Sequence, residues 1–275
     1  EQEVTPLLIN SHLIQEIVFA VPSMDMEQKK CLYEKYKDTG CKIKVYDYPT
    51  AENIENGRRK VREFDVHELL FRAQHSIIDE TTSGYYRDKV VLITGGGGSI
   101  GSELCRQVAR MHPERLIVLD IYENGAYDIQ QELSMLYGNQ LDLIVEIASV
   151  CDRHAIEKIL QLHHPHVILH AAAHKHVPLM ERNCCEAVQN NVFGTLNMVR
   201  AALEHQVAHF VLISTDKAVR PTNVMGASKR VAEMILQAIT AARHAPFPHR
   251  QPIAQDSWRC PTRFSMVRFG NVLGS

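Results

Sequence analysis

A glycine-rich turn constrains the fold of this chain more than any other stretch. The sequence VLITGGGGSIGSEL (91–104) places Gly95, Gly98 and Gly101 three residues apart, after an apolar run typical of a buried strand and at the start of a helix. Glycine at these positions allows a tight turn, close approach of the backbone to a pyrophosphate, and close packing of the helix on the strand. The free N–H groups of the helix then face the negative charge. The pattern predicts a dinucleotide-binding site.

Around this turn, apolar runs alternate regularly with amphipathic helical patterns. The expected strands are 89–95, 115–120, 142–149, 166–172, 209–215 and 264–271, and the expected helices are 99–111, 124–137, 153–163, 184–205 and 226–239. Such alternation predicts an α/β fold with a doubly wound parallel sheet covered on both faces. We assign residues 84–275 to this NAD(P)-binding Rossmann domain, together with the start of a substrate-binding part. Residues 243–262 carry four prolines and are expected to form a surface loop.

The first 83 residues predict a partial, small Rossmann-like α/β domain and a linker. Residues 16–22 have a strand pattern, 26–40 a helical pattern with Gly40 as C-cap, and 41–49 a second strand pattern. A helix over 65–73 is expected to link this piece to the next domain. The chain starts without methionine and ends without a closing helix. We therefore expect a piece of a longer protein whose C-terminal substrate domain is largely missing.

Bulk composition excludes several classes of function. The net charge is −2, from 30 basic and 32 acidic residues, so no nucleic-acid partner is indicated. Seven cysteines without a C-x-x-C pair suit a reducing compartment, and the expected location is the cytoplasm. No apolar run approaches the roughly 20 residues of a membrane span. Six histidines fall within 163–176, but no zinc spacing accompanies them, and we expect no metal.

Two aspartates follow the second and third expected strands. Asp120 lies nineteen residues after Gly101. A carboxylate there hydrogen-bonds the adenosine ribose and repels a 2′-phosphate, which favours NAD over NADP. Asp152 lies where the adenine ring is commonly held, but it could equally be the N-cap of the next helix. Both interpretations of Asp152 stay open.

Four segments together carry a family resemblance: TGGGGSIG (94–101), HAAAHKHVPLMERN (170–183), STDKAVRPTNVMGASK (214–229) and RFGNVLGS (268–275). They resemble the CapD-like polysaccharide-biosynthesis family of UDP-N-acetylglucosamine 4,6-dehydratases, within the extended short-chain dehydrogenase/reductase superfamily. The resemblance covers about residues 85–275. Together with the position of these residues at strand ends, it implies a cofactor site formed by Thr94, Gly95, Gly98, Ser99, Ile100, Gly101, Ala171, Ala172 and Ala173.

One residue departs from the usual superfamily pattern. Members normally combine a serine or threonine with a tyrosine and a lysine four residues apart, which share one helix face. Here Ser214 or Thr215 supplies the hydroxyl and Lys229 the amine, but Met225 occupies the tyrosine position. A thioether cannot accept a proton from a substrate hydroxyl. The enzyme is then inactive, the chain is a pure binding protein, or the chemistry lies on other groups.

The resemblance favours chemistry on other groups. It implies that Asp216 is the acid that protonates the departing C6 hydroxyl and Lys217 the base that removes the C5 proton. The methionine is typical of longer family members, which carry an extra N-terminal domain and often transmembrane helices. The parent chain would then be anchored in the inner membrane with this part facing the cytoplasm.

The remaining candidates concern the substrate. Lys175 and His176 follow the fourth expected strand, and Asn271 follows the last one. All three are expected to contact the substrate. Asn191 could bind near the active site or be an ordinary polar residue of its helix. The expected partner is UDP-N-acetylglucosamine or a related UDP-sugar, and a homo-oligomer is expected. Two alternatives are a UDP-sugar 4-epimerase, against which Met225 argues, and a catalytically silent NAD-binding regulator.

Overall fold

The computed structural model describes residues 14–21, 26–46, 61–63, 79–242 and 262–272. The chain divides into two compact units, Glu1–Ser76 and Ile77–Ser275. The boundary expected between residues 83 and 84 falls within helix α4 (Glu80–Tyr86), which belongs to the second unit. The expected linker helix over 65–73 lies outside the described residues.

The first unit contains the predicted strand, helix and strand. Strand β1 (Glu16–Phe19) pairs in parallel with β2 (Lys42–Tyr46), and helix α2 (Met26–Tyr36) connects them. A 3₁₀ turn, η1 (Lys37–Thr39), ends at Gly40, whose φ of 73° is the left-handed conformation expected of a C-cap glycine. The structure adds a short strand that the sequence pattern did not predict, β3 (Val61–Glu63), antiparallel to β2.

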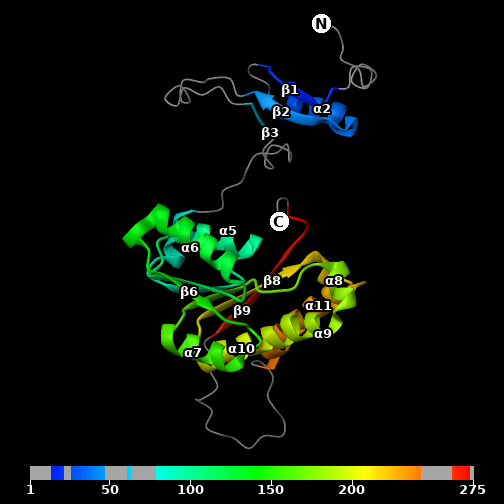
Figure 1. Cartoon of the computed structure of the whole chain (residues 1–275). Helices are drawn as coiled ribbons and strands as arrows, with labels where there is room; N and C mark the ends of the chain where they lie inside the picture. The colour runs from blue at the N-terminus through cyan, green and yellow to red at the C-terminus, as the bar shows by residue number, and fades with distance from the viewer. Residues whose placement is uncertain (1–13, 22–25, 47–60, 64–78, 243–261, 273–275) are drawn as a thin grey trace, which may run out of the picture. The chain divides into compact units, whose positions relative to one another are not determined.

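The second unit, shown in Figure 1, is built on a six-stranded parallel sheet. The strand order is β6-β5-β4-β7-β8-β9. Its strands are β4 (Val90–Thr94), β5 (Arg115–Asp120), β6 (Leu143–Ile147), β7 (Val167–His170), β8 (His209–Thr215) and β9 (Arg263–Phe269). The chain adds strands outward from β4 to β6, then returns to the other side of β4 with β7. A ligand crevice is expected outside the carboxyl ends of the strands, where this order reverses between β4 and β7.

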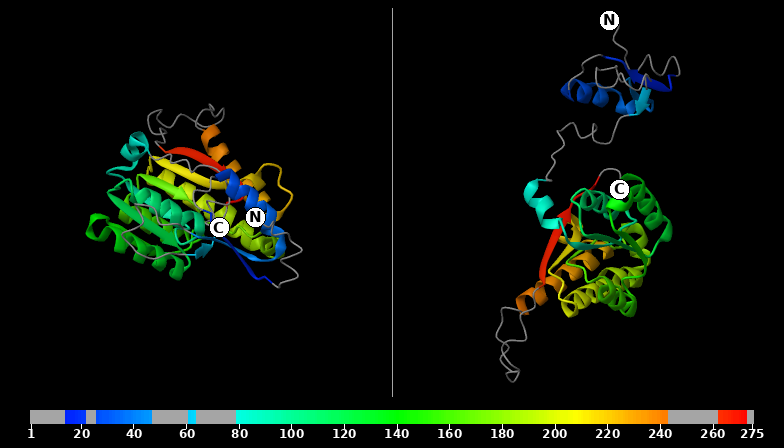
Figure 2. Two further views of the ribbon diagram at one scale, coloured as in Figure 1. Left: turned by 90° about the horizontal axis from the view of Figure 1, so that it is seen from above. Right: turned by 90° about the vertical axis from the view of Figure 1, so that its left-hand side faces the viewer.

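Helices cover both faces of this sheet, as the pattern predicted (Figures 1 and 2). Helices α5 (Ser99–Ala109) and α6 (Glu123–Tyr137) pack on one face through one apolar cluster. A second cluster joins the other face to α7 (Arg153–His163), α10 (Thr195–Glu204) and α11 (Val224–Ala242). Every residue of β4 is buried, because helices cover the central strand from both sides. The doubly wound fold class is therefore confirmed.

The helix predicted over 184–205 is interrupted. It consists of α9 (Cys184–Ala187), a π-helix η4 (Val188–Gly194) and α10, and a short helix α8 (Val177–Arg182) precedes it. A Cβ on Gly194 would lie 2.7 Å from a methyl group of Val150, so the π-helix packs closely on the segment after β6. π-Helical turns are rare and frequently occur at functional sites. The apolar periodicity of the sequence does not reveal such a widened turn.

Candidate active site

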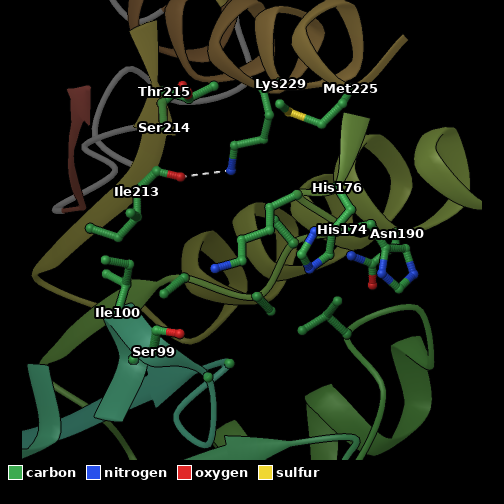
Figure 3. Close-up of a pocket in the computed structure, with 18 of the residues that line it drawn as sticks. Ser99, Ile100, His174, His176, Asn190, Ile213, Ser214, Thr215, Met225 and Lys229 are labelled. Carbon is green, nitrogen blue, oxygen red and sulfur yellow. Dashed lines mark hydrogen bonds between the residues drawn. The ribbon is translucent and has the colours of Figure 1, made fainter. Parts of the chain in front are cut away.

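A cavity of about 900 Å³ opens at the carboxyl ends of the parallel strands. The loop after β4, the end of β5 and the segment after β6 line one part of it, and the segments after β7, β8 and β9 with the start of α11 line the other. Figure 3 shows lining residues from the start of α5, the segment after β7, the end of β8 and the start of α11 around the same space. The cavity lies where the strand order reverses, as expected of a ligand site in an open α/β sheet.

The glycine loop leaves room for backbone only. Gly95 adopts a φ of 68°, and a Cβ on it would lie 2.7 Å from the backbone of Ala172. A Cβ on Gly97 would lie 2.6 Å from the backbone nitrogen of Ala126, and one on Gly101 would collide with the carbonyl oxygen of Gly95. Gly98 is the N-cap of α5 and makes no side-chain cap. The exposed helix N-terminus and the cradle of glycines fit a pyrophosphate.

Asp120 supports this loop. One carboxylate oxygen accepts the N–H of Gly97 and the other accepts the N–H of Tyr122, each at 2.9 Å. Each oxygen can accept a further hydrogen bond, and Asp120 lines the cavity. The predicted ribose contact is compatible with this position, and Asp120 also fixes the shape of the phosphate loop.

Asp152 lies at the start of helix α7. Its carboxylate accepts the N–H of Ala155 at 3.0 Å and caps helix α7. It is not among the residues that line the cavity, whereas Ser149 and Val150 are. Of the two interpretations of Asp152, the structure supports the N-cap.

Thr94 lies beneath the loop and outside the cavity lining. Its hydroxyl is 2.7 Å from Nδ1 of His170, whose Nε2 is 3.0 Å from the hydroxyl of Thr195. Thr195 donates its own proton to the carbonyl of Asn191 at 2.7 Å, so it accepts from Nε2–H and Nδ1 accepts from Thr94. Burial, followed by the charge of Lys229, lowers the pKa of His170 to about 3. His170 is therefore neutral, and Thr94 positions the loop without lining the cavity.

The side chain of Asn191 is buried and bonds to neighbouring segments of the protein. It is 1% exposed, and its amide oxygen accepts the N–H of His174 at 2.8 Å. Its amide nitrogen donates to the carbonyl of His174 and to the hydroxyl of Ser228. The neighbouring Asn190 lines the cavity instead (Figure 3). The predicted residue Asn191 therefore does not line the cavity, whereas its neighbour in the π-helix does.

The acid and base of the predicted catalytic segment are neighbours in space. Lys217 Nζ lies 3.4 Å from Oδ1 of Asp216 and donates to Oδ1 of Asn271 at 2.9 Å. Thr215 donates to the same Asp216 oxygen at 3.0 Å. Thr215, Lys217 and Asn271 line the cavity, but Asp216 does not, and its side chain is 56% exposed. The hydrogen bond from Thr215, with further bonds and charge from Lys217, lowers the pKa of Asp216 although partial desolvation opposes it.

Lys229 and Met225 project from the first turns of α11 into the cavity (Figure 3). Lys229 donates to the carbonyl of Ile213 at 2.6 Å, and its burial lowers the pKa of the amine to about 8. Met225 is 4% exposed and packs against Met180 and Ala187. Gly226 lets α11 pack closely against the backbone of Lys217, because a Cβ at position 226 would lie 2.5 Å from the carbonyl oxygen of Lys217.

The serine that precedes Thr215 also lines the cavity, but its hydroxyl is bonded to a buried carboxylate. Ser214 is 5% exposed and donates its proton to the buried carboxylate of Glu233 at 2.7 Å. Of the two candidate hydroxyls, Thr215 is the one on the exposed side of the strand end. At the far wall of the cavity, Lys175 and His176 are exposed and line it, as does His174.

Within the described residues, no group of three or more histidines, cysteines or carboxylates is placed to hold a metal ion. The helices of that same part of the chain include none that is both long and apolar enough to cross a membrane.

The strand order, the glycine loop and the lysine-bearing helix define a Rossmann fold like that of the short-chain dehydrogenase/reductase proteins. The protein Pen from Bacillus thuringiensis matches 70% of this chain with 30% identity and a TM-score of 0.59, over 52% of its own chain. A UDP-glucose 4-epimerase from Stenotrophomonas maltophila, solved with NAD and formylated UDP-arabinopyranose, matches 56% of this chain with a TM-score of 0.51, over 49% of its own chain. At 22% identity this second likeness shows the fold alone.

The chain belongs to the polysaccharide biosynthesis protein family, whose model matches residues 91–275. The capsular polysaccharide biosynthesis protein CapD of Staphylococcus aureus is 39% identical over 98% of this chain and 43% of its own length. The uncharacterized membrane protein MJ1061 of Methanocaldococcus jannaschii is 40% identical over 70% of this chain and 52% of its own. An inverting UDP-N-acetylglucosamine 4,6-dehydratase of Campylobacter jejuni is 30% identical over 69% and 51%. The chain thus spans about half the length of these relatives.

Proposed function

We propose that this chain is the NAD-binding and catalytic part of a dehydratase that converts UDP-N-acetylglucosamine to a UDP-4-keto-6-deoxy-sugar for capsule, O-antigen or glycoprotein glycan synthesis. The observation that carries the proposal is the acid–base pair Asp216–Lys217, whose lysine lines the cavity together with Lys229 and with Met225, the residue at the position where related enzymes use tyrosine. Membership in a polysaccharide biosynthesis family and the similarity to a 4,6-dehydratase support it.

The cofactor side of the cavity suits NAD. The N–H groups at the start of α5 would bind the pyrophosphate, and the Asp120 carboxylate would bind the adenosine ribose and disfavour a 2′-phosphate. Lys229, which lines the same cavity, would exchange its bond to the Ile213 carbonyl for the nicotinamide ribose. When bound, NAD supplies an acceptor for the hydride of sugar C4 and returns that hydride to C6.

The pair Asp216–Lys217 can perform both proton transfers of the elimination. The lowered pKa of Asp216 makes it a carboxylate, which becomes a carboxylic acid when it receives the proton of the C4 hydroxyl. Lys217, acting as a neutral amine, then removes the C5 proton, and the Asp216 acid protonates the C6 hydroxyl, which leaves as water. When the hydride returns to C6, Lys217 gives its proton back to C5, so both groups end in their starting protonation states.

The proton of the C4 hydroxyl needs another acceptor, because Met225 has none. Thr215 lines the cavity and already donates to Asp216 at 3.0 Å, so it can receive the C4 proton as it passes its own to the carboxylate. A 4-epimerase of this superfamily depends on a tyrosine at the Met225 position, and we therefore favour dehydration over epimerisation.

The test follows the sugar nucleotide by mass spectrometry after incubation with NAD. Because the chain spans about half the length of its relatives, we would assay it alone and joined to the C-terminal half of CapD. Dehydration predicts loss of the mass of one water. A changed sugar at unchanged mass would indicate an epimerase. Tight NAD binding with no sugar conversion in either protein would indicate a binding regulator and overturn the proposal.

We also propose that the full protein is attached to the inner membrane with this part facing the cytoplasm. The similarity to a relative that is named as a membrane protein supports this arrangement. Fractionation of cells that express the full-length protein, followed by protease treatment of inverted vesicles, tests it. Recovery of the family domain in the soluble fraction would contradict it.

A further inference from the structure

A fully buried carboxylate contacts the end of β8, directly before the proposed catalytic residues Thr215, Asp216 and Lys217. Glu233 is 0% exposed and is one helical turn beyond Lys229 on α11. Arg268 donates to both of its oxygens, through Nε at 2.8 Å and a terminal nitrogen at 2.6 Å, and Ser214 donates at 2.7 Å. We call Ser214, Glu233 and Arg268 the Glu233 clamp. Arg230 adds one peripheral bond at 3.0 Å from the helix itself.

The clamp is charged. Burial alone would raise the pKa of Glu233, but the hydrogen bonds from Arg268, Ser214 and Arg230 outweigh it and lower the pKa to about 2. The two-pronged contact from Arg268 fixes the direction of the carboxylate as well as its charge. Buried ion pairs contribute little net stability compared with apolar packing of similar volume, so stabilisation alone does not account for this group.

The members of the clamp flank the proposed catalytic residues in sequence and in register. Ser214 directly precedes Thr215 at the end of β8, and it pairs in register with Arg268 of β9. Three residues after Arg268, Asn271 accepts the amine of Lys217. In the described sheet β9 is an edge strand whose neighbour is β8, so the clamp is what ties its end to α11.

We propose that Glu233 is a positioning residue for the active site: it holds the ends of β8 and β9 against α11, so that Asn271 meets the Lys217 amine in the cavity. This inference deepens the proposed function and rests on it for the consequence in turnover. The contacts of Glu233 with Ser214 and Arg268, and that of Asn271 with Lys217, are present whatever the reaction is.

The first test separates turnover from binding in the protein joined to the CapD half. The variants are Glu233→Gln, which removes the charge at constant size, and Arg268→Lys, which keeps the charge but loses the two-pronged contact. We expect kcat to fall at least about tenfold in both, the scale on which small misplacements of reacting groups act, with KM changed less than about twofold. Arg230→Gln is the matched control, because it removes one bond to the same carboxylate without touching β8 or β9, and its kcat should stay within about twofold.

A second measurement works on the chain alone and does not require turnover. The acetylation rate of Lys217 at fixed pH, measured by mass spectrometry, reports how well its amine is held by Asn271 and Asp216. Glu233→Gln should raise this rate roughly tenfold as the strand ends open, and Arg230→Gln should not. Should Glu233→Gln fail to fold, Ser214→Ala removes a single bond and should give the same effects to a smaller extent.

The outcomes distinguish the two proposals. Faster labelling of Lys217 with no dehydration in any protein would support the clamp and overturn the proposed reaction. Unchanged labelling in Glu233→Gln, or equal loss of kcat in Arg230→Gln, would overturn the positioning role. A fall of kcat that only matches the loss of folded protein would do the same.

Discussion

The two halves of the cavity are built in opposite ways. The phosphate half, around the loop after β4, consists of backbone and glycines that lie close in the sequence, with Asp120 as its main side chain. The catalytic half, at the ends of β8 and β9, consists of side chains from distant segments. Lys217 and Asn271 are 54 residues apart in sequence, yet their polar atoms are 2.9 Å apart.

The two halves should therefore tolerate different kinds of substitution. The phosphate half depends on empty space, so an added atom disrupts it and a lost side chain matters little. The catalytic half depends on charges and hydrogen bonds held in place, so removing one polar atom disrupts it without altering the cavity.

The largest effect is expected at Asp216. Asp216→Asn keeps the shape but cannot deliver a proton, so we expect turnover in the joined protein to fall by about 10² to 10⁴, the usual contribution of an acid–base group. NAD affinity should not change, because the proposed NAD contacts are the start of α5, Asp120 and Lys229. Asp128→Asn, on the exposed face of α6, is the control. Full turnover in Asp216→Asn would remove the basis of the dehydratase assignment.

The next largest effect is expected at Gly101. The methyl group of Gly101→Ala would collide with the carbonyl of Gly95, so the loop must shift and NAD should bind at least about a hundredfold more weakly, or 2.7 kcal/mol by the usual conversion. Titration calorimetry measures the affinity and circular dichroism checks folding. Gly84→Ala in α4, where nothing lies within 4 Å of the new methyl group, should bind NAD normally. Equal affinity in both variants would show that the loop does not hold the nucleotide.

A smaller effect concerns the buried His170, which is hydrogen-bonded to Thr94 at the end of β4 and to Thr195 of α10. Its folded pKa of about 3 lies below the ordinary value of 6.5, so the unfolded chain binds the extra proton first as the pH falls. The stabilising contribution is complete above pH 6.5 and is lost as the pH falls from there toward 3, by up to about 1.4 kcal/mol per pH unit. Denaturant unfolding between pH 4.5 and 6.5 should show this slope, and His170→Gln should lack it.

His209 provides the control for that measurement. Its pKa is also lowered, by partial burial and by the charges of Arg263 and Lys89. His209→Gln should therefore keep the part of the slope that His170 contributes. Identical slopes in the native chain and in His170→Gln would mean that His170 takes up its proton without unfolding the chain.

The smallest effect is expected at Asp152, and it tests the border of the phosphate half. As the N-cap of α7, Asp152 should contribute about 1 kcal/mol to stability, which Asp152→Ala would remove. NAD affinity should be unchanged. A clear loss of NAD affinity with little loss of stability would restore the adenine contact that the sequence left open.

Much of the fold could be predicted because the signals are local. The glycine spacing and the alternation of apolar runs with helical patterns require only neighbouring residues, and the boundaries of α7 and β8 agree with the prediction to the residue. The interruption of the helix over 184–205 could not be predicted, since the π-helix arises where Gly194 packs against Val150 and Thr195 bonds to Asn191. Neither contact changes the helical spacing of apolar residues in the sequence.

Local sequence patterns therefore predicted the parallel sheet and the phosphate loop, because each depends on residues a few positions apart, whereas the proposed acid–base pair comes from the family resemblance. The tertiary structure was needed to show that Asn190 lines the cavity while Asn191 does not. It was also needed to show that Thr94 bonds to His170, that Asp152 caps α7, and that Glu233 bonds to Ser214 at the end of β8. The reason is physical: a side chain's role depends on which surface it faces and which charges meet it there, and those neighbours come from segments that only folding brings together.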